Sequence, residues 1–125
     1  MNDNFDFDGY FNRLSKSKFR ASFKLKDNDI KYIDDKGMDI ITSHAYDFVN
    51  KRLRPKIIVN DGKQTPFKGH PVFIAQHATA CCCRDCISKW LKLSKDRELT
   101  NEEVDLIVSI LIKWINTQYN EKKSN

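Results

Sequence analysis

The chain has 125 residues, of which 40% are hydrophobic and 31% are charged, a balance that is typical of a folded domain and excludes global disorder. No apolar run approaches the roughly 20 residues of a membrane helix, and the N-terminal residues MNDNFDFDGYFNRL lack the basic region and apolar core of a secretory signal. The formal net charge is +5, and we expect a cytoplasmic protein with reduced cysteines and no membrane partner.

The first half of the chain is expected to form three helices and one extended segment. Apolar residues at three- and four-residue steps predict a helix over residues 5–14. Alternating apolar and polar residues over Phe19–Leu25 predict a short strand, or an extended segment packed across helices. Further helices are predicted over residues 27–36 and 38–53, and Pro55 ends the second of them.

The second half of the chain begins with a long loop, because residues 55–70 are rich in proline and glycine. Helices are predicted over residues 82–93 and 101–118, and a capping box of Thr100 and Glu103 precedes the latter. The apolar face of this last helix is very wide. The helix must therefore lie at the centre of the domain or form a homodimer interface.

Together these elements predict a compact, mainly α-helical single domain of about five helices, with at most one short strand. The globular part is expected to span residues 1–118, and a flexible polar tail is expected at 119–125. The Pro/Gly-rich loop lies near the middle of the chain, and such segments often carry function.

Residues 70–86, HPVFIAQHATACCCRDC, hold all four cysteines and two of the three histidines. Cys83 and Cys86 form a C-x-x-C pair, and a helix that begins near Cys82 would place these thiols on one face. Zinc takes four sulfur or nitrogen donors, and helix N-terminal amides lower the pKa of thiols. The pattern therefore predicts a zinc site with the candidate ligands His70, His77, Cys82, Cys83 and Cys86.

Two other interpretations of the same residues stay open. Cysteines are among the most buried residue types, so the run can be packed beneath the last helix. A thiolate at a helix start beside Arg84 can also act as a nucleophile, with Cys83 as the reactive thiol and His77 as its base. That arrangement would suit a thiol hydrolase, and a nuclease that uses one metal ion is a related alternative. His44 is expected to be structural.

Basic residues form two clusters that can attract phosphate backbones. The candidate nucleic-acid contacts are Lys16, Lys18, Arg20, Lys24, Lys51, Arg52, Arg54 and Lys56. Phe19 and Phe23 lie within the first cluster and could stack on bases, but we expect them to be buried because aromatic residues dominate cores. The alternative is that both clusters are only solvated surface.

The leading functional hypothesis is a small metal-binding protein, with zinc as the metal, that contacts nucleic acid through the basic clusters. One alternative is an enzyme with a Cys/His centre. Another is a partner-binding or inhibitor protein of phage origin, with the last helix as its docking face.

Four stretches of the chain carry a resemblance to a known family: FRASFKL, GMDIITSHAYDFVNKRL, NDGKQTPFKGHPVFIAQHATACCCRDCISKW and RELTNEEVDLIVSILIKWI. Over about residues 11–116 the chain resembles a bacterial and phage family known only as a domain of unknown function. The resemblance implies no activity.

The chain departs from the family pattern at two positions. Cys81 stands where the family pattern A-T-C-C-R-G-C has threonine, so the resemblance favours Cys82, Cys83 and Cys86 for any shared chemistry. Leu91 stands where the family often has a histidine after K-W, which leaves His70 and His77 as the nitrogen candidates.

Overall fold

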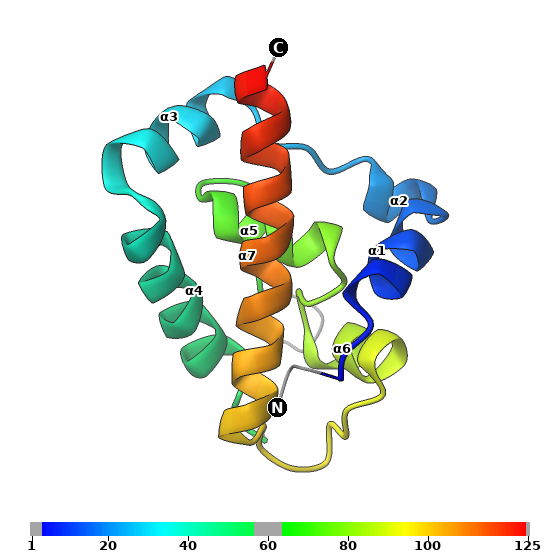
Figure 1. Ribbon diagram of the computed structural model, residues 1–125. Coiled ribbons are helices and arrows are strands. Elements are labelled where there is room, and N and C mark those ends of the chain that lie inside the picture. The colour runs from blue at the N-terminus through cyan, green and yellow to red at the C-terminus, as the bar shows by residue number, and fades with distance from the viewer. Residues whose placement is uncertain (1–3, 57–63, 125) are drawn as a thin grey trace.

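The structure, a computed structural model, describes residues 4–56 and 64–124. These residues form seven helices and no strand, so the predicted mainly α-helical fold is confirmed. The helices are α1 (Phe7–Ser15), α2 (Lys18–Ala21), α3 (Asp27–Lys36), α4 (Met38–Arg52), α5 (Pro71–Ala78), α6 (Arg84–Leu91) and α7 (Asn101–Ser124). In Figure 1, α7 runs through the middle of the molecule, with α4 on one side and α1 and α2 on the other. Among the described helices, none combines the length and the hydrophobicity that crossing a membrane requires.

The central helix α7 begins with the predicted capping box. The Glu103 backbone N–H donates to the Thr100 hydroxyl at 3.1 Å, and the Thr100 backbone N–H donates to the Glu103 carboxylate at 2.9 Å. Ile107, Leu111 and Ile115, four residues apart, are fully buried. Helices α4 and α5 pack against α7, so its place at the centre of the domain accounts for its wide apolar face.

The polar C-terminal segment continues α7 as far as Ser124, whereas the sequence predicts a separate tail from residue 119. Three side chains of this last part reach α3, and one of them, Lys122, forms an ion pair with Asp27 at 3.2 Å. The Tyr119 hydroxyl and the Lys123 ammonium both donate to the carboxylate of Asp34, Lys123 at 2.8 Å. These contacts join residues 85 and 89 positions apart in the chain, so helical periodicity within the segment could not indicate them.

The strand predicted over Phe19–Leu25 is wrong, because its first residues belong to the short helix α2. Ser17 caps this helix, since its hydroxyl accepts the Arg20 backbone N–H at 3.2 Å. The alternation of apolar and polar residues does not correspond to one buried face. The Arg20 side chain is buried, with 8% of the residue exposed, whereas Phe19 is 54% exposed.

Helix α5 has no counterpart among the predicted elements. All of its residues from Pro71 to Ala78 are buried, and a helix buried on every side has no amphipathic period to read. The start of the helix is well specified. His70 Nδ1 accepts the Val72 backbone N–H at 3.0 Å, and Pro71 occupies the first turn, where its missing N–H costs nothing. Residues 57–63 of the predicted loop lie outside the described residues.

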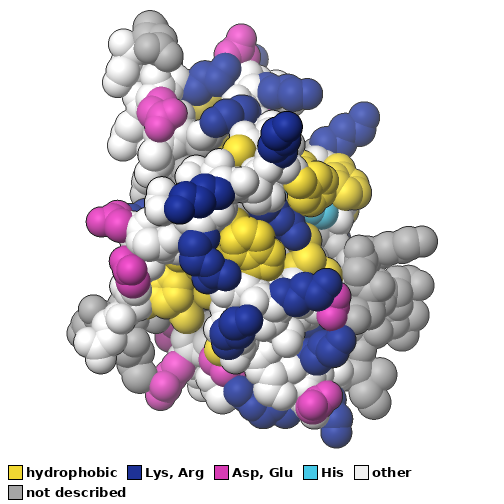
Figure 2. Space-filling model, turned by 90° about the vertical axis from the view of Figure 1, so that its right-hand side faces the viewer, with side chains coloured by type: hydrophobic (Ala, Val, Ile, Leu, Met, Phe, Trp, Pro, Cys, Tyr) yellow, Lys and Arg dark blue, Asp and Glu magenta, His cyan; other side chains and the backbone are white. Residues whose placement is uncertain are grey.

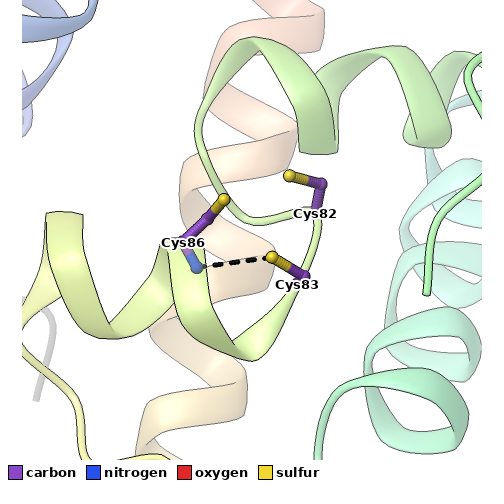
Figure 3. A group of neighbouring side chains, drawn as sticks. All are labelled: Cys82, Cys83 and Cys86. Carbon is purple, nitrogen blue, oxygen red and sulfur yellow. Dashed lines mark hydrogen bonds between the residues drawn. The ribbon is translucent and has the colours of Figure 1, made fainter. Parts of the chain in front are cut away.

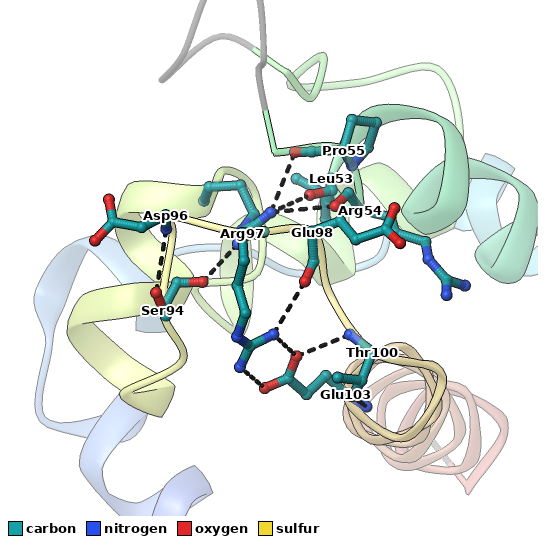
Figure 4. A network of polar contacts seen from close by, with 10 residues as sticks. Leu53, Arg54, Pro55, Ser94, Asp96, Arg97, Glu98, Thr100 and Glu103 are labelled. Atoms are coloured by element: carbon teal, nitrogen blue, oxygen red, sulfur yellow. Dashed lines mark hydrogen bonds and ion pairs between the residues drawn. The ribbon is translucent and has the colours of Figure 1, made fainter.

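A buried arginine fastens the start of α6 to two distant segments (Figure 4). Only 3% of Arg84 is exposed, and its guanidinium donates hydrogen bonds to the backbone carbonyls of residues that Figure 4 labels. These carbonyls, at 2.5–3.3 Å, belong to Leu53, Arg54, Pro55, Ser94 and Arg97. The guanidinium therefore joins the end of α4 to the segment between α6 and α7, and fixes the first residue of α6 against both.

We predict that Arg84→Met destabilises the domain by about 2–4 kcal/mol, because the carbonyls lose their donor while the new side chain fills a similar volume. Urea unfolding followed by circular dichroism measures this change in the free energy of unfolding. Arg54→Met is the matched control, since that guanidinium donates to the exposed side chain of Asn50, four residues before it. A loss of less than 1 kcal/mol for Arg84→Met, or equal losses for both variants, would contradict the structural role of Arg84.

Candidate metal centre

A tight turn after α5 delivers the chain to the cysteines. Ala80 has a left-handed φ of 61°. The Cys81 N–H donates to the Gln76 carbonyl at 2.8 Å and the Ala80 N–H to the His77 carbonyl at 3.4 Å, the hydrogen bonds of a Schellman motif. A left-handed alanine costs about 1–2 kcal/mol, and burial of its methyl group in the core offsets part of that cost.

Three thiols come together where α6 begins (Figure 3). The Sγ atoms of Cys82, Cys83 and Cys86 all lie within 4.8 Å of one another. Cys83 is the N-cap of α6, since its Sγ accepts the Cys86 backbone N–H at 3.4 Å. Cys82 and Cys83 are buried and Cys86 is half-buried. The three residues form a group that can hold a metal ion.

Arg20 of α2 closes one side of this thiol group. Its guanidinium donates to Cys82 Sγ at 3.6 Å, to Cys86 Sγ at 3.3 Å and to the His77 carbonyl at 2.7 Å. Within the described residues, Arg20 forms no ion pair with a carboxylate. A buried positive charge is stabilised by hydrogen bonds or by an ionisable partner, and the thiol group is the acidic group that contacts Arg20.

The electrostatics of the thiol group favour one thiolate in the absence of metal. Hydrogen bonds from the Cys82 and Cys83 thiols, together with the Arg20 guanidinium, lower the pKa of Cys86 well below that of a free thiol. Hydrogen bonding to Cys82 and Cys86, with burial, raises the pKa of Cys83. The group therefore offers one negative charge to Arg20 and keeps two further thiols that a metal ion can deprotonate.

The fourth cysteine, Cys81, is not part of this group. Its side chain is fully buried, its Sγ donates to the Thr79 carbonyl at 3.6 Å, and burial raises its pKa to about 12. Cys81 is thus a neutral packed thiol. The packing interpretation describes Cys81, which is fully buried and lies outside the thiol group.

His77 lies next to the site but outside the group of sulfurs. Its Nε2 is 3.1 Å from both the Thr65 and Pro66 carbonyls, so this nitrogen must carry the proton and donate to them. Nδ1 is then the nitrogen with a free lone pair. Among the described residues no hydrogen bond joins His77 to Cys83, and the base–nucleophile pair of the enzyme hypothesis is not formed in this structure.

His70 is not brought to the cysteines either. Its Nδ1 accepts the Val72 N–H as the cap of α5, so its Nε2 carries the proton and donates to His44 Nδ1 at 2.9 Å. The rings of Tyr32 and Phe48 pack edge-on against it. The hydrogen bond between His70 and His44 therefore joins the start of α5 to α4.

The predicted nucleic-acid contacts are divided between two sides of the molecule. Lys16, Lys18 and Lys24 are exposed near α2, and Lys51 and Lys56 are exposed at the end of α4. Helices α2 and α4 lie on opposite sides of α5 and α7 in Figure 1, so the two clusters do not form one surface.

The three arginines among these candidates are buried or half-buried and contact other groups of the protein, whereas the lysines are exposed. The structure corrects the prediction that Arg20 is a surface contact for nucleic acid, because its side chain is buried against the thiols. Arg52 lies over the Phe48 and Phe73 rings, with its guanidinium carbon 5.3 and 5.1 Å from the ring centroids. Arg54, half-buried, donates to Asn50 of α4.

The fold and the site thus define a small all-α domain with a three-cysteine group that can hold a metal ion. The model of the family described as "Domain of unknown function (DUF4186)" matches residues 8–116, and the chain belongs to this family. No solved structure matches the chain significantly.

We predict that His70 makes stability depend on pH below neutrality. Burial, with the nearby His44, lowers the pKa of His70 from 6.5 to about 4, so protonation favours the unfolded chain. The contribution is complete above pH 6.5 and is lost as the pH falls toward 4, an upper bound of about 3 kcal/mol.

His70→Asn is the variant that isolates this effect, because asparagine can still cap α5 but does not titrate. The free energies of unfolding of both proteins, measured by urea titration from pH 7 to pH 4, should converge as the pH falls. Parallel curves over this range would show that His70 titrates normally in the folded protein.

Proposed function

We propose that this protein binds one zinc ion through the thiolates of Cys82, Cys83 and Cys86. The observation that carries the proposal is the buried Arg20 guanidinium, which contacts two sulfurs of the group. Three thiolates and a divalent cation sum to one negative charge, and Arg20 balances that charge. The same site without metal has to protonate two of its thiols to reach balance.

The donor set is suited to zinc because thiolates are soft ligands that zinc binds strongly. Zinc–sulfur bonds of about 2.3 Å in a tetrahedron place the sulfurs about 3.8 Å apart, so sulfurs that already lie within 4.8 Å need only small adjustments. A fourth donor comes from outside this group. His77, through Nδ1, and a water molecule are the two candidates.

A metal ion at this position would stabilise the loop that precedes α5. The Thr65 hydroxyl donates to the Cys82 carbonyl at 2.7 Å, and the Gln76 amide donates to Thr65 Oγ1 and the Cys81 carbonyl at 3.2 Å each. The backbone around the thiols thus anchors both the loop and α5. Fixing the thiols would fix these neighbours as well, which is the structural role that we propose for the ion.

A second component of the proposed function is contact with nucleic acid. Figure 2 looks onto the side of the molecule that carries α1 and α2, where lysine and arginine side chains surround hydrophobic patches and acidic side chains lie mostly toward the edges. Lys16, Lys18 and Lys24 are exposed on this part of the chain. Such a surface attracts phosphate groups in a salt-dependent manner.

We predict that the purified, reduced protein, made without a histidine tag, contains one zinc per chain by plasma mass spectrometry. Cys83→Ser and Cys86→Ser should lose the metal and lower the melting temperature together, because each removes a ligand. Cys81→Ser is the matched control, and its hydroxyl can still donate to the Thr79 carbonyl.

Two results would contradict the zinc proposal. One is a metal-free protein that stays folded and does not take up added zinc. This result would favour a thiol centre in which Cys86, whose pKa is lowered, takes the place of Cys83 as the reactive residue. The other is equal metal loss in the Cys81, Cys83 and Cys86 variants, which would point to a general folding defect.

A further inference from the structure

A group of stacked aromatic rings with one exposed member lies beside the thiol group. The Phe67 ring stacks on the His77 ring, with centroids 4.1 Å apart and an angle of 7° between the planes. Phe23 lies nearly parallel to both rings, 5.5 Å from His77 and 6.3 Å from Phe67. His77 is buried, whereas Phe67 is 63% exposed, so the face of Phe67 that does not cover His77 is open to solvent.

Phe19 adds a second exposed ring to this side of the molecule. Its centroid lies 5.2 Å from that of Phe23, edge to face. The sequence predicts that Phe19 and Phe23 are buried, but Phe23 is only half-buried and Phe19 lies mostly in solvent. An exposed phenylalanine costs solubility and adds little to folding, so two of them on one face indicate a ligand.

Positive charges border these rings. A hollow of about 340 Å³ is lined by Phe23 and Phe67 and by three lysines, Lys24, Lys26 and Lys68. The acidic residue in its wall, Asp29, is buried, and its carboxylate accepts the Lys26 backbone N–H at 2.9 Å as part of the cap of α3. The hollow therefore presents aromatic rings and ammonium groups to a ligand.

A second hollow continues the same surface toward α7. It measures about 350 Å³ and shares Phe23 and Lys24 with the first. Its walls also include Lys113 and Trp114 of α7 and Arg20 and Ala21 of α2. Asp8 is the acidic residue that lines it. The two hollows together form a track along which aromatic and positively charged side chains recur.

We propose that this track binds single-stranded nucleic acid, with a base stacked on Phe67 and the phosphate backbone held by Lys24 and Lys68. The inference rests on the nucleic-acid contact proposed above and names its substrate class. Base–aromatic stacking and a positively charged groove are the two elements of sequence-tolerant recognition of single strands. A duplex keeps its base faces in the stack, so it could use the lysines but not Phe67.

The test compares fluorescein-labelled oligothymidylate, oligouridylate and a duplex of equal length by fluorescence anisotropy over a range of salt concentrations. The wild-type protein should bind the single strands more tightly than the duplex. Phe67→Ala should weaken single-strand binding about tenfold, whereas Phe67→Trp should retain it, because indole also stacks on bases. The tighter of the two single strands identifies RNA or DNA as the ligand.

Two further variants separate charge from stacking. The double variant Lys24→Ala/Lys68→Ala should reduce the slope of log affinity against log salt concentration by about 0.7 for each phosphate that it no longer neutralises. Lys51→Ala/Lys56→Ala, on the α4 side, is the matched control for charge and should change nothing. Ile40→Ala removes an exposed apolar side chain elsewhere, and it is the matched control for Phe67→Ala.

The outcomes distinguish this inference from the proposals on which it builds. Equal binding of duplex and single strands, with no effect of Phe67→Ala, would overturn the stacking inference while leaving the phosphate interaction in place. No binding of any oligonucleotide at low salt would overturn both. Metal content tests the zinc proposal independently of these binding measurements, and it should be unchanged in Phe67→Ala.

Discussion

The hydrogen bonds of the Arg84 guanidinium are the constraint on which the rest of the structure depends. This side chain is the first residue of α6 and directly follows Cys83, so its position sets the direction in which α6 leaves the thiol group. Carbonyls from the end of α4 and from the segment before α7 hold it in place (Figure 4). Three parts of the chain that share no periodic pattern are joined by one buried cation. The carbonyl dipoles around this cation replace part of the hydration that it loses on burial.

Arg20 is the second buried guanidinium, and its surroundings differ from those of Arg84 in one respect. Arg84 donates to backbone carbonyls, whereas Arg20 contacts sulfurs that can be ionised. The contacts of Arg84 are structural. Those of Arg20 belong to a candidate functional site, because the sulfurs that it contacts can change their charge. Both arginines lie next to the same three cysteines, Arg84 through the backbone that it shares with them and Arg20 through its side chain. The start of α6 therefore fixes the position of the thiol group, and Arg20 of α2 supplies the positive charge beside it.

The parts of the fold that sequence could predict are those with a local signal. The capping box at Thr100 and Glu103 marks the start of α7, and amphipathic spacing marks α3 and α4. Helix α5 has no such signal because burial on all sides erases the period, and α2 has none because four residues cannot show one. The same division applies to the site. The C-x-x-C spacing indicates Cys83 and Cys86, and Cys82 directly precedes this pair. Arg20 reaches Cys82 from 62 residues away, and His70 lies elsewhere because it caps a helix that sequence could not predict.

The three thiols occupy five consecutive positions, and this has a consequence for folding. A zinc ion could meet all three in an unfolded chain, before any helix has docked, so the denatured ensemble would compete for the metal. Binding to that ensemble reduces the stabilisation that a ligand confers on the native state. The net gain would then come from what the unfolded chain lacks, namely the Arg20 charge and the capped amide at the start of α6. Under this arrangement the ion would be captured early, and the fold would close around it.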